Sequence, residues 1–552
     1  MTFRILVVLL ALSFQLFSQS LTVSNLPILV IDTKGATIRD EPKIPAKFSL
    51  YDRGKGFLNQ LTDKPALNFW AGIEFRGSTS QADFYFLPGL VKKPYGFEIW
   101  TDSVAMKAQN VALVQMPAES DWVLNASYND RSFLRDVLAQ KLAGDLGLKK
   151  SNTRYVEVIL NDAYQGIYIL MEKIKQGRNR LDIADLLPVD NAGDEVTGGY
   201  LLKIDKTSGS PSRNWTSSYI SGGGTGKVLF QIEYPKNELI TTQQFNYIKN
   251  YVNAFEKSLQ EESGLKPSAA YRSMMDMPSF VNYFLINELT RNVDGFRLST
   301  YFFKDKDSKG GKLTMGPTWD YNLSFGNADY YDGYLPQGWA YNKLEMSEQG
   351  RADYVQTPFW WGKLLRDSVF VNSLKSRWTS LRKTSLTPQN IFKFMDSTTL
   401  ALKEPMQRNF GRFPLYGKKV WPNYYVGNNA NDELYWMQNW ITARIAWLDG
   451  TIKLLDASLV LSNTEPLEIK CYPNPTRQSV RLDFPLGQDS KVFMELYDSM
   501  GRRVRQQDLG NLSAGQQRID IDLSTESAGR YIIHLSDPSQ TIYRFPVVKS
   551  LE

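Results

Sequence analysis

The sequence predicts an α+β protein with a β-rich first part, a helical second part and a small β-sandwich at the end of the chain. Three observations lead to this prediction. The 552 residues exceed one ordinary domain and correspond to roughly three or four units. Short β-like runs dominate before residue 172, whereas helix-periodic runs dominate after residue 241. The composition changes again near residue 466, where short alternating strands return.

The first 20 residues predict a secretory signal peptide. Arg4 precedes a short apolar run from Ile5 to Phe17, and small or polar residues follow at Ser18 to Ser20. This run is too short to span a bilayer comfortably, and no other stretch approaches about 18 uninterrupted apolar residues. We therefore expect an exported protein, secreted or associated with the outer membrane surface, with no transmembrane span after signal cleavage.

Four further segments follow the signal peptide. Residues 21–75 predict an N-terminal β segment, which is either a strand layer added to the next unit or a separate cap. Residues 76–450 predict the main body, and residues 451–465 a linker. In residues 466–552, turn signals recur about every 8 to 12 residues, which is typical of a β-sandwich.

The main body reads as strands, one helix and a hairpin, followed by a series of helices. Asn161 and Asp162 stand between two β-rich arms and predict the hairpin turn. A helix is predicted over about Met277 to Thr290. The other helices are predicted near residues 131–147, 241–262, 359–367, 373–383, 388–406 and 432–448. A β-first, helix-second order is a sensible layout for a bilobal enzyme with a cleft.

The rarest residue types exclude several classes of chemistry. The chain has one cysteine, Cys471, and one histidine, His534, both near its end. An internal disulfide, a thiolate metal cage and a Ser-His-Asp triad in the main body are therefore excluded. Any chemistry there must use carboxylates, amines, hydroxyls and an oxygen-liking cation. The net charge of +6 is too mild to predict nucleic acid as a partner.

Two carboxylates in the segment Phe280–Gly326 form a candidate site. A predicted helix leads into Asp294, and a short strand leads into Asp320, 26 residues later. Enzymes of phosphoryl transfer use one such carboxylate to orient a nucleophile and another to hold a metal. The alternative is a solvated loop aspartate and a helix-capping aspartate.

The C-terminal unit resembles a type A sorting domain. The matching stretches are YPNP at Tyr472–Pro475, LYDSMGRRV at Leu496–Val504, SAGRYIIHL at Ser527–Leu535 and the closing FPVVKSLE. The resemblance implies that the type IX secretion machinery delivers the protein to the cell surface or the medium. The alternative is a generic sandwich that binds carbohydrate or another domain.

The main body resembles the CotH family, the secreted relatives of spore coat protein H. Matching stretches occur in the family's order, among them FRGSTSQ at Phe75–Gln81, KKPYGFE at Lys92–Glu98, TGGYLLKID at Thr197–Asp205, NVDGFRLSTYF and GPTWDYNLSFGN. The resemblance implies an atypical, bilobal protein-kinase-like fold. It also implies an ATP-dependent and Mg²⁺- or Mn²⁺-dependent kinase acting on Ser or Thr of secreted or surface proteins.

The resemblance also assigns roles to individual residues. Asp294 is implied to be the catalytic residue that orients or deprotonates the acceptor hydroxyl, and Asp320, with Asn322, to bind the metal. The candidates for holding the nucleotide are Arg76, Lys93 and Glu172. The alternative for the two cations is solvation at strand ends, and for Glu172 a hinge or a surface pair with its neighbour.

Two positions depart from the family's pattern. Asn322 stands where many members carry a second aspartate, and Ser299 where they carry an asparagine. One charge removed at about 4 Å corresponds to on the order of 4 kcal/mol at an effective dielectric constant of about 20, before solvation offsets it. The sequence therefore leaves three functions open: a protein kinase, a catalytically weakened or dead surface-binding protein, and an enzyme that transfers another group from ATP.

Overall fold

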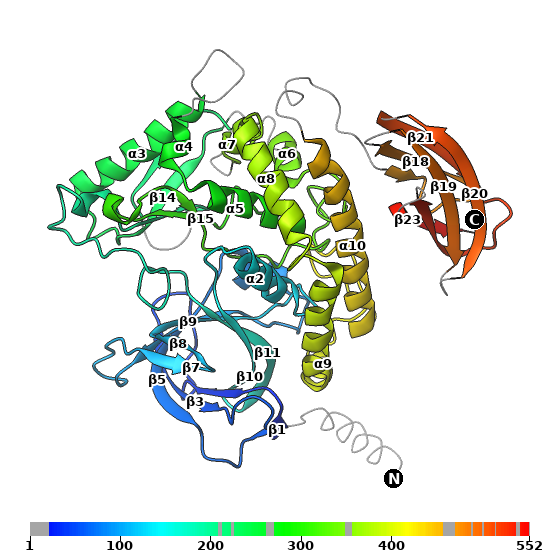
Figure 1. Cartoon of the computed structure of the whole chain (residues 1–552). Coiled ribbons are helices and arrows are strands. Elements are labelled where there is room, and N and C mark those ends of the chain that lie inside the picture. Colours follow the sequence, from blue (N-terminus) through cyan, green and yellow to red (C-terminus); the bar gives the residue numbers. More distant parts are fainter. Residues whose placement is uncertain are drawn as a thin grey trace, which may run out of the picture.

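Helices and sheets alternate along the chain, which confirms the α+β class (Figure 1). The computed structural model describes residues 21–207, 212–221, 226–260, 270–347, 356–455, 470–486, 489–498, 502–513, 515–536 and 541–550. The predicted signal peptide lies outside the described residues. Among these residues, no helix is both long and apolar enough to cross a membrane.

The first part of the chain folds into a closed seven-stranded barrel. Antiparallel pairs give the order β10-β11-β9-β6-β5-β3-β2, and a parallel pair between β10 and β2 closes the barrel. Alternating apolar residues fill the interior, including Phe48, Phe97 and Trp122. The strands are β2 (Ile28–Asp32), β3 (Ile44–Tyr51), β5 (Leu67–Phe75), β6 (Tyr95–Trp100), β9 (Asp121–Asn125), β10 (Thr153–Leu160) and β11 (Ala163–Glu172).

The barrel shows how the N-terminal β segment is attached. Its outer strands pair with the main body, β2 with β10 and β5 with β6, and β3 lies between β2 and β5. The segment is therefore a layer added to the next unit. The boundary at residue 75 therefore coincides with the end of a barrel strand. Without these strands, β6 and β10 would be open sheet edges with unpaired backbone groups.

The predicted hairpin is confirmed. Leu160 pairs with Ala163 across a two-residue turn, and Asn161 and Asp162 both have positive φ angles, 48° and 61°. These are the backbone angles of the turn that joins antiparallel strands most tightly, and asparagine and aspartate tolerate them well.

A second sheet and a set of helices form the next part of the chain. The sheet has the order β13-β14-β12-β15-β16, and α5 is buried along nearly its whole length. The strands are β12 (Tyr200–Ile204), β13 (Asn214–Thr216), β14 (Leu229–Tyr234), β15 (Thr300–Lys304) and β16 (Thr314–Met315). The helices are α2 (Arg135–Asp145), α3 (Thr242–Gln260), α4 (Tyr271–Met274), α5 (Met277–Thr290), α6 (Ala340–Ser347), α7 (Trp360–Leu364), α8 (Ser368–Leu381), α9 (Pro388–Arg412) and α10 (Ala430–Leu454).

The helix predictions hold, with shifted ends. Helix α5 has the predicted bounds, because Asp276 caps its first turn by accepting from the Ser279 N–H. Helix α8 begins five residues earlier than predicted, since Asp367 accepts from the Val369 N–H and so provides the cap. Helix α9 extends six residues further than predicted, through Pro405.

The helices connect the barrel to the rest of the body. Helix α2 lies between the barrel and the helical part, and α9 runs beside the barrel (Figure 1). The Asn409 side chain of α9 accepts from the Ile167 N–H of β11 at 3.1 Å. The buried Lys92 ammonium donates to the same amide oxygen at 3.1 Å and also to the Ala126 carbonyl at 2.9 Å. These bonds fix α9 against the barrel wall.

The C-terminal unit consists of two sheets packed face to face. One has the order β17-β18-β21 and the other β20-β19-β22-β23. The Phe484 ring of the first lies 5.4 Å from Tyr543 and 6.4 Å from Phe545 of the second. The strands are β17 (Lys470–Tyr472), β18 (Ser479–Leu486), β19 (Ser490–Asp498), β20 (Arg503–Leu512), β21 (Gly515–Asp522), β22 (Gly529–Ser536) and β23 (Thr541–Lys549).

Short elements complete the chain. Two small antiparallel pairs are β1 (Val23–Ser24) with β4 (Asn59–Gln60), and β7 (Val111–Leu113) with β8 (Met116–Glu119). The 3₁₀ turns are η1 (Thr79–Gln81), η2 (Asp83–Tyr85), η3 (Glu195–Thr197) and η4 (Asp307–Lys309). Turns η1 and η2 matter for the site because they follow the barrel strand β5 directly.

Candidate active site

Two loops carry the predicted carboxylates, and both have unusual backbone conformations. Asp294 follows the end of α5, and Asp320 follows β16. Five non-glycine residues in these loops have positive φ angles: Arg291, Phe296, Ser299, Asp320 and Phe325. Such conformations cost roughly 1–3 kcal/mol each and persist only where the surroundings hold them. Their concentration around two acids makes this region a candidate for function.

Buried packing and backbone bonds hold the two loops together. The Phe296 ring packs 4.9 Å from the Trp361 ring, and the Phe325 N–H donates to the Thr290 carbonyl at 2.8 Å. The side chain of Asn292 donates to the Asp320 carbonyl at 3.2 Å. Since Asn292 lies two residues before Asp294, this bond joins the two acidic loops directly.

Asp294 has few and long contacts. The Arg297 guanidinium lies 3.5 Å from its Oδ1, and the Tyr330 hydroxyl donates to the same oxygen at 3.5 Å. The Asp294 N–H donates to Asn292 Oδ1 at 3.2 Å. The carboxylate is therefore oriented from one side, and 20% of the side chain is exposed. A partly exposed, oriented carboxylate is suited to accept a proton from a hydroxyl.

Asp320 lies among other carboxylates. Burial, followed by the charges of Asp136, Asp294 and Asp205, raises the pKa of Asp320 from 3.8 to about 8, while Arg76 opposes the shift. Asp294 and Asp320 are thus close enough for their charges to interact. Like charges held together in this way favour protonation or a bound cation.

Asp136 and Asp205 are acidic neighbours that the sequence reasoning missed. Burial raises the pKa of Asp136 to about 6, although its Oδ1 accepts from the Tyr321 N–H at 2.7 Å. Burial also raises the pKa of Asp205, against hydrogen bonds from the backbone of Lys206 and Ser299. Asp136 lies on α2, and Asp205 follows β12. One signal existed for Asp205, which ends the quoted stretch TGGYLLKID; Asp136 is one of many acids in first helical turns.

Arg76 is the cation whose charge opposes the raised pKa of Asp320. It follows the barrel strand β5, and its guanidinium lies 4.8 Å from the centre of the Trp319 ring. Its Nη1 is buried and has no hydrogen-bond partner in the described part of the chain. Burial lowers the Arg76 pKa, while Tyr301 and Asp320 raise it. A buried guanidinium nitrogen without a partner fits an anionic ligand such as a phosphate.

Lys93 and Glu172 have other partners. The Lys93 ammonium lies 3.4 Å from Asp83, and Glu172 lies 3.1 Å from Arg180 and accepts from the Asn152 N–H at 2.9 Å. These contacts hold Glu172 at the end of β11. Lys173 follows the same strand end. Burial lowers its pKa, the charge of Asp121 raises it, and the charge of Arg76 lowers it further.

Asn322 belongs to a cluster of amides. Its Nδ2 donates to Asn129 Oδ1 at 3.3 Å, and its backbone carbonyl accepts from Asn327 at 2.8 Å. Asn423 donates to the Asn129 carbonyl at 2.7 Å. Since the side-chain nitrogen of Asn322 is directed to Asn129, the side-chain oxygen Oδ1 of Asn322 remains the atom that could ligate a metal.

The donor set fits a cation held jointly with phosphate. Mg²⁺ prefers oxygen ligands and, in nucleotide sites, usually takes one or two carboxylates while phosphates and waters complete the shell. Asp320 and the Asn322 carbonyl offer such donors. Within the residues that the structure describes, no three acidic, histidine or cysteine side chains converge on a point suited to a metal ion. A closed, all-protein metal centre therefore does not fit these residues, whereas an open one does.

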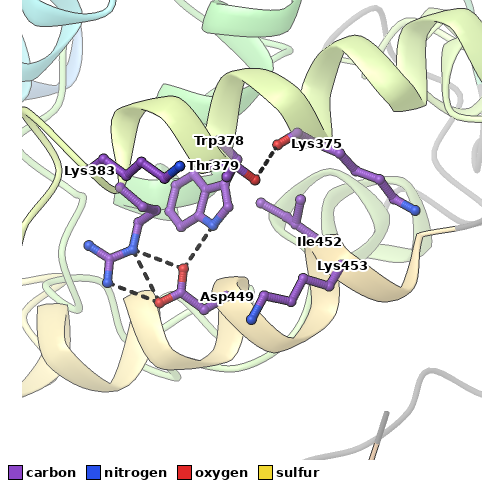
Figure 2. A pocket seen from close by; sticks show the side chains of 8 residues that line it. Lys375, Trp378, Thr379, Lys383, Asp449, Ile452 and Lys453 are labelled. Carbon is purple, nitrogen blue, oxygen red and sulfur yellow. Dashed lines mark hydrogen bonds and ion pairs between the residues drawn. The ribbon is translucent and has the colours of Figure 1, made fainter. Parts of the chain in front are cut away.

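A separate cavity of about 410 Å³ lies between α8 and α10 (Figure 2). Its walls include Trp378 and Asp449, and Arg382 pairs with Asp449 at 2.9 Å. The other lining residues are Lys375, Thr379, Lys383, Ile452 and Lys453. None of the acidic residues around Asp320 lines it, so this cavity is distinct from the acidic site.

Comparison with known families identifies both parts of the chain. A family model described as "CotH kinase protein" matches residues 73–448, and one described as "Secretion system C-terminal sorting domain" matches residues 470–549. The first match spans more than half of the chain, so the protein belongs to the CotH family. The second match confirms the sorting domain of the type IX secretion system and supports delivery to the cell surface or the medium.

Other comparisons add little. No curated protein matches the chain. A solved structure of the alkylpurine DNA glycosylase AlkC of Pseudomonas fluorescens, bound to DNA containing an abasic site analog, is similar over 34% of this chain at 15% identity and a TM-score of 0.12. The similar region spans 50% of that chain. A TM-score this low carries no argument.

Proposed function

We propose that this exported CotH protein is a protein kinase, which transfers the γ-phosphate of ATP to Ser or Thr of secreted or surface proteins. One observation carries the proposal. Asp294 and Asp320, from separate loops joined through Asn292, lie within electrostatic reach of each other and of a stacked, partly unpartnered arginine. In this proposal the barrel and the helical part act as the two lobes of an atypical kinase.

Each residue then has a defined task. Asp294 orients the acceptor hydroxyl and takes its proton, because Tyr330 and Arg297 orient its Oδ1 while the side chain remains partly exposed. Arg76 donates its unpartnered Nη1 to a phosphate oxygen. Asp320 and Asn322 hold Mg²⁺ or Mn²⁺, which supplies charge neutralisation on the phosphates. Lys93 and Glu172 support the surrounding structure and do not contact the nucleotide.

The departures at Asn322 and Ser299 keep a second function in view. An amide in place of a carboxylate binds a cation without neutralising it, so metal affinity falls. The second candidate is a surface protein of the same fold that binds nucleotide weakly or not at all, or that transfers another group from ATP. The Ser299 N–H donates to Asp205, a bond that any residue at this position can make, so it leaves both candidates open.

A labelling experiment separates these functions. The purified chain is incubated with γ-labelled ATP and Mg²⁺ or Mn²⁺, with casein as an added acceptor. The kinase predicts label on the protein or on casein, and its loss in the Asp294→Ala and Asp320→Ala variants. Asp182→Asn is the matched control, because Asp182 is an exposed aspartate remote from these loops in sequence. Stabilisation by nucleotide without any label would support the second candidate and contradict the first.

A further inference from the structure

Three aromatic side chains from separate parts of the chain meet at the surface beside Asp294. Phe84 belongs to η2, Tyr330 follows the Asp320 loop, and Trp421 lies between α9 and α10. The ring centres of Phe84 and Trp421 are 6.4 Å apart, and those of Trp421 and Tyr330 are 6.2 Å apart. We call these three residues the aromatic strip.

Two of the three rings of the strip are exposed, whereas Tyr330 is half-buried. Phe84 is 73% exposed and Trp421 is 48% exposed. The two residues after Phe84, Tyr85 and Phe86, are buried, so this segment has apolar side chains that do reach the core. Single exposed apolar residues are common on protein surfaces, whereas a row of rings from three distant segments, with Trp421 in contact with the other two, indicates a site of interaction.

The strip is held in place by the same loop that carries Asp320. Asn423 donates to Asn327 Oδ1 at 2.7 Å, and the Asp329 N–H donates to the Pro422 carbonyl at 2.8 Å. The buried Arg131 donates to Asn423 Oδ1 at 2.8 Å. Trp421 therefore stands on a segment fixed by buried hydrogen bonds, and a ligand that contacts it does not first have to order that segment.

The strip leads directly to the candidate base. The Tyr330 hydroxyl lies 3.5 Å from Asp294 Oδ1, while the Tyr330 ring stacks in parallel with Trp421. If an acceptor hydroxyl lies at Asp294, the polypeptide that carries this hydroxyl passes beside Tyr330. This continuity favours a polypeptide over a free sugar or a second copy of the chain as the occupant.

We infer that the aromatic strip binds the acceptor protein through an aromatic or other large apolar side chain close to the phosphorylated Ser or Thr. The inference rests on the proposed kinase function and adds its specificity. The strip begins at Tyr330, beside Asp294, and ends at Phe84. Extended chain advances about 3.3 Å per residue, so the length of the strip corresponds to about four residues. The apolar side chain is therefore expected within about four positions of the acceptor.

Peptide arrays test this inference. Each peptide has one central Ser or Thr and a single fixed residue at a varied position, and the full-length chain is supplied with γ-labelled ATP and Mg²⁺. The strip predicts the strongest labelling when Phe, Tyr or Trp stands within about four residues of the acceptor. Trp421→Ala should raise the KM for these peptides about tenfold and leave kcat nearly unchanged, since buried aromatic anchors dominate such interfaces. Tyr435→Ala is the matched control, because Tyr435 is 62% exposed and lies outside the strip.

A binding readout separates failure of the strip from failure of the kinase. Fluorescently tagged Asp294→Asn protein is applied to the same arrays, where retention on aromatic peptides should disappear when Trp421→Ala is added. Retention without labelling by the unmutated protein would contradict the kinase and support the strip. Labelling without any preference for aromatic residues would overturn the strip alone. Trp421-dependent retention on neutral oligosaccharides, and not on peptides, would also overturn it.

Discussion

Glu288 on α5 and Asp320 in the loop after β16 are both acidic, yet their surroundings are opposite. Glu288 is buried and accepts from the Ala340 N–H at 2.8 Å, the Tyr341 N–H at 2.9 Å and Arg444 at 2.9 Å. Burial raises the Glu288 pKa, and the charge of Arg444 is the largest effect opposing it. Around Asp320, the largest effects after burial are the charges of three further carboxylates.

The difference separates a structural charge from a candidate functional one. At Glu288 each carboxylate oxygen has donors, and the arginine supplies the countercharge, so nothing further needs to bind. At Asp320 three further carboxylates act against one arginine, an arrangement typical of sites that bind a cation or exchange protons. Substitutions at the two regions should therefore act on different quantities: stability at Glu288 and activity at the acidic site.

The largest expected effect is that of Asp294→Asn on phosphotransfer. The amide keeps the shape of the side chain but accepts a proton poorly, so the rate should fall about 10²- to 10⁴-fold. The melting temperature should stay near that of the unmutated protein, because Asp294 has only long contacts at 3.5 Å. Initial rates of label transfer and a thermal melt measure both. A rate within a factor of two of the unmutated rate would contradict the assigned role.

Glu288→Gln should act in the opposite way. The substitution leaves the Arg444 guanidinium buried without a countercharge, which typically costs about 3–5 kcal/mol of unfolding free energy. Chemical denaturation measures this loss. If the variant proves too unstable to purify, a reduced yield of soluble protein that Glu288→Asp partly restores would serve the same purpose. If Glu288→Gln keeps the unfolding free energy of the unmutated protein, Glu288 is not the structural charge that the comparison with Asp320 assumes.

Arg76→Lys sharpens the comparison from the cationic side. Lysine keeps the charge but loses the planar fork that stacks on Trp319 and supplies Nη1. The KM for ATP should therefore rise about tenfold, while the KM for the protein acceptor changes little. Lys93→Met should leave the KM for ATP unchanged, because Lys93 is paired with Asp83. An equal effect of the two variants would argue against the role of Arg76.

The smallest expected effect is a pH-dependent gain in stability of the ligand-free Asp320→Asn variant. The Asp320 pKa is about 8 in the folded protein and 3.8 ordinarily, so its ionisation disfavours the folded state increasingly between about pH 4 and pH 8. Removing the charge should raise the melting temperature by a few degrees at pH 8 and by nothing at pH 4. A gain that is equal at both pH values would contradict an Asp320 pKa raised in this way.

Much of the fold follows from local sequence patterns, whereas the closed barrel and the full acidic site do not. The Asn161–Asp162 turn and helix α5 are specified by residues next to them in sequence. Closure depends on the parallel pairing of β2 with β10, more than 100 residues apart, which no local pattern encodes.

The same distinction applies to the site. Asp294 and Asp320 were predictable because each follows a buried element and lies in a family motif. Asp136 and Tyr330 reach the site through tertiary packing. Asp136 lies in a stretch that resembles the family, but nothing in that stretch distinguishes it from the other acids of first helical turns. Lys93 and Glu172 pair with Asp83 and Arg180, and their contact with a nucleotide stays a prediction. Charge and motif identify candidate site residues, whereas their partners in the fold follow only from tertiary packing.

The most direct test of the account is a Mn²⁺ titration in the presence of a non-hydrolysable ATP analogue. Electron paramagnetic resonance monitors the binding of Mn²⁺ during the titration. The unmutated protein should bind Mn²⁺ with the nucleotide, and Asp320→Asn should weaken this binding at least about tenfold, since a direct carboxylate ligand contributes more than the outer-shell groups whose loss costs about 10- to 100-fold. Equal Mn²⁺ affinity in the two proteins would contradict the claim that the excess negative charge at Asp320 serves a metal–nucleotide site.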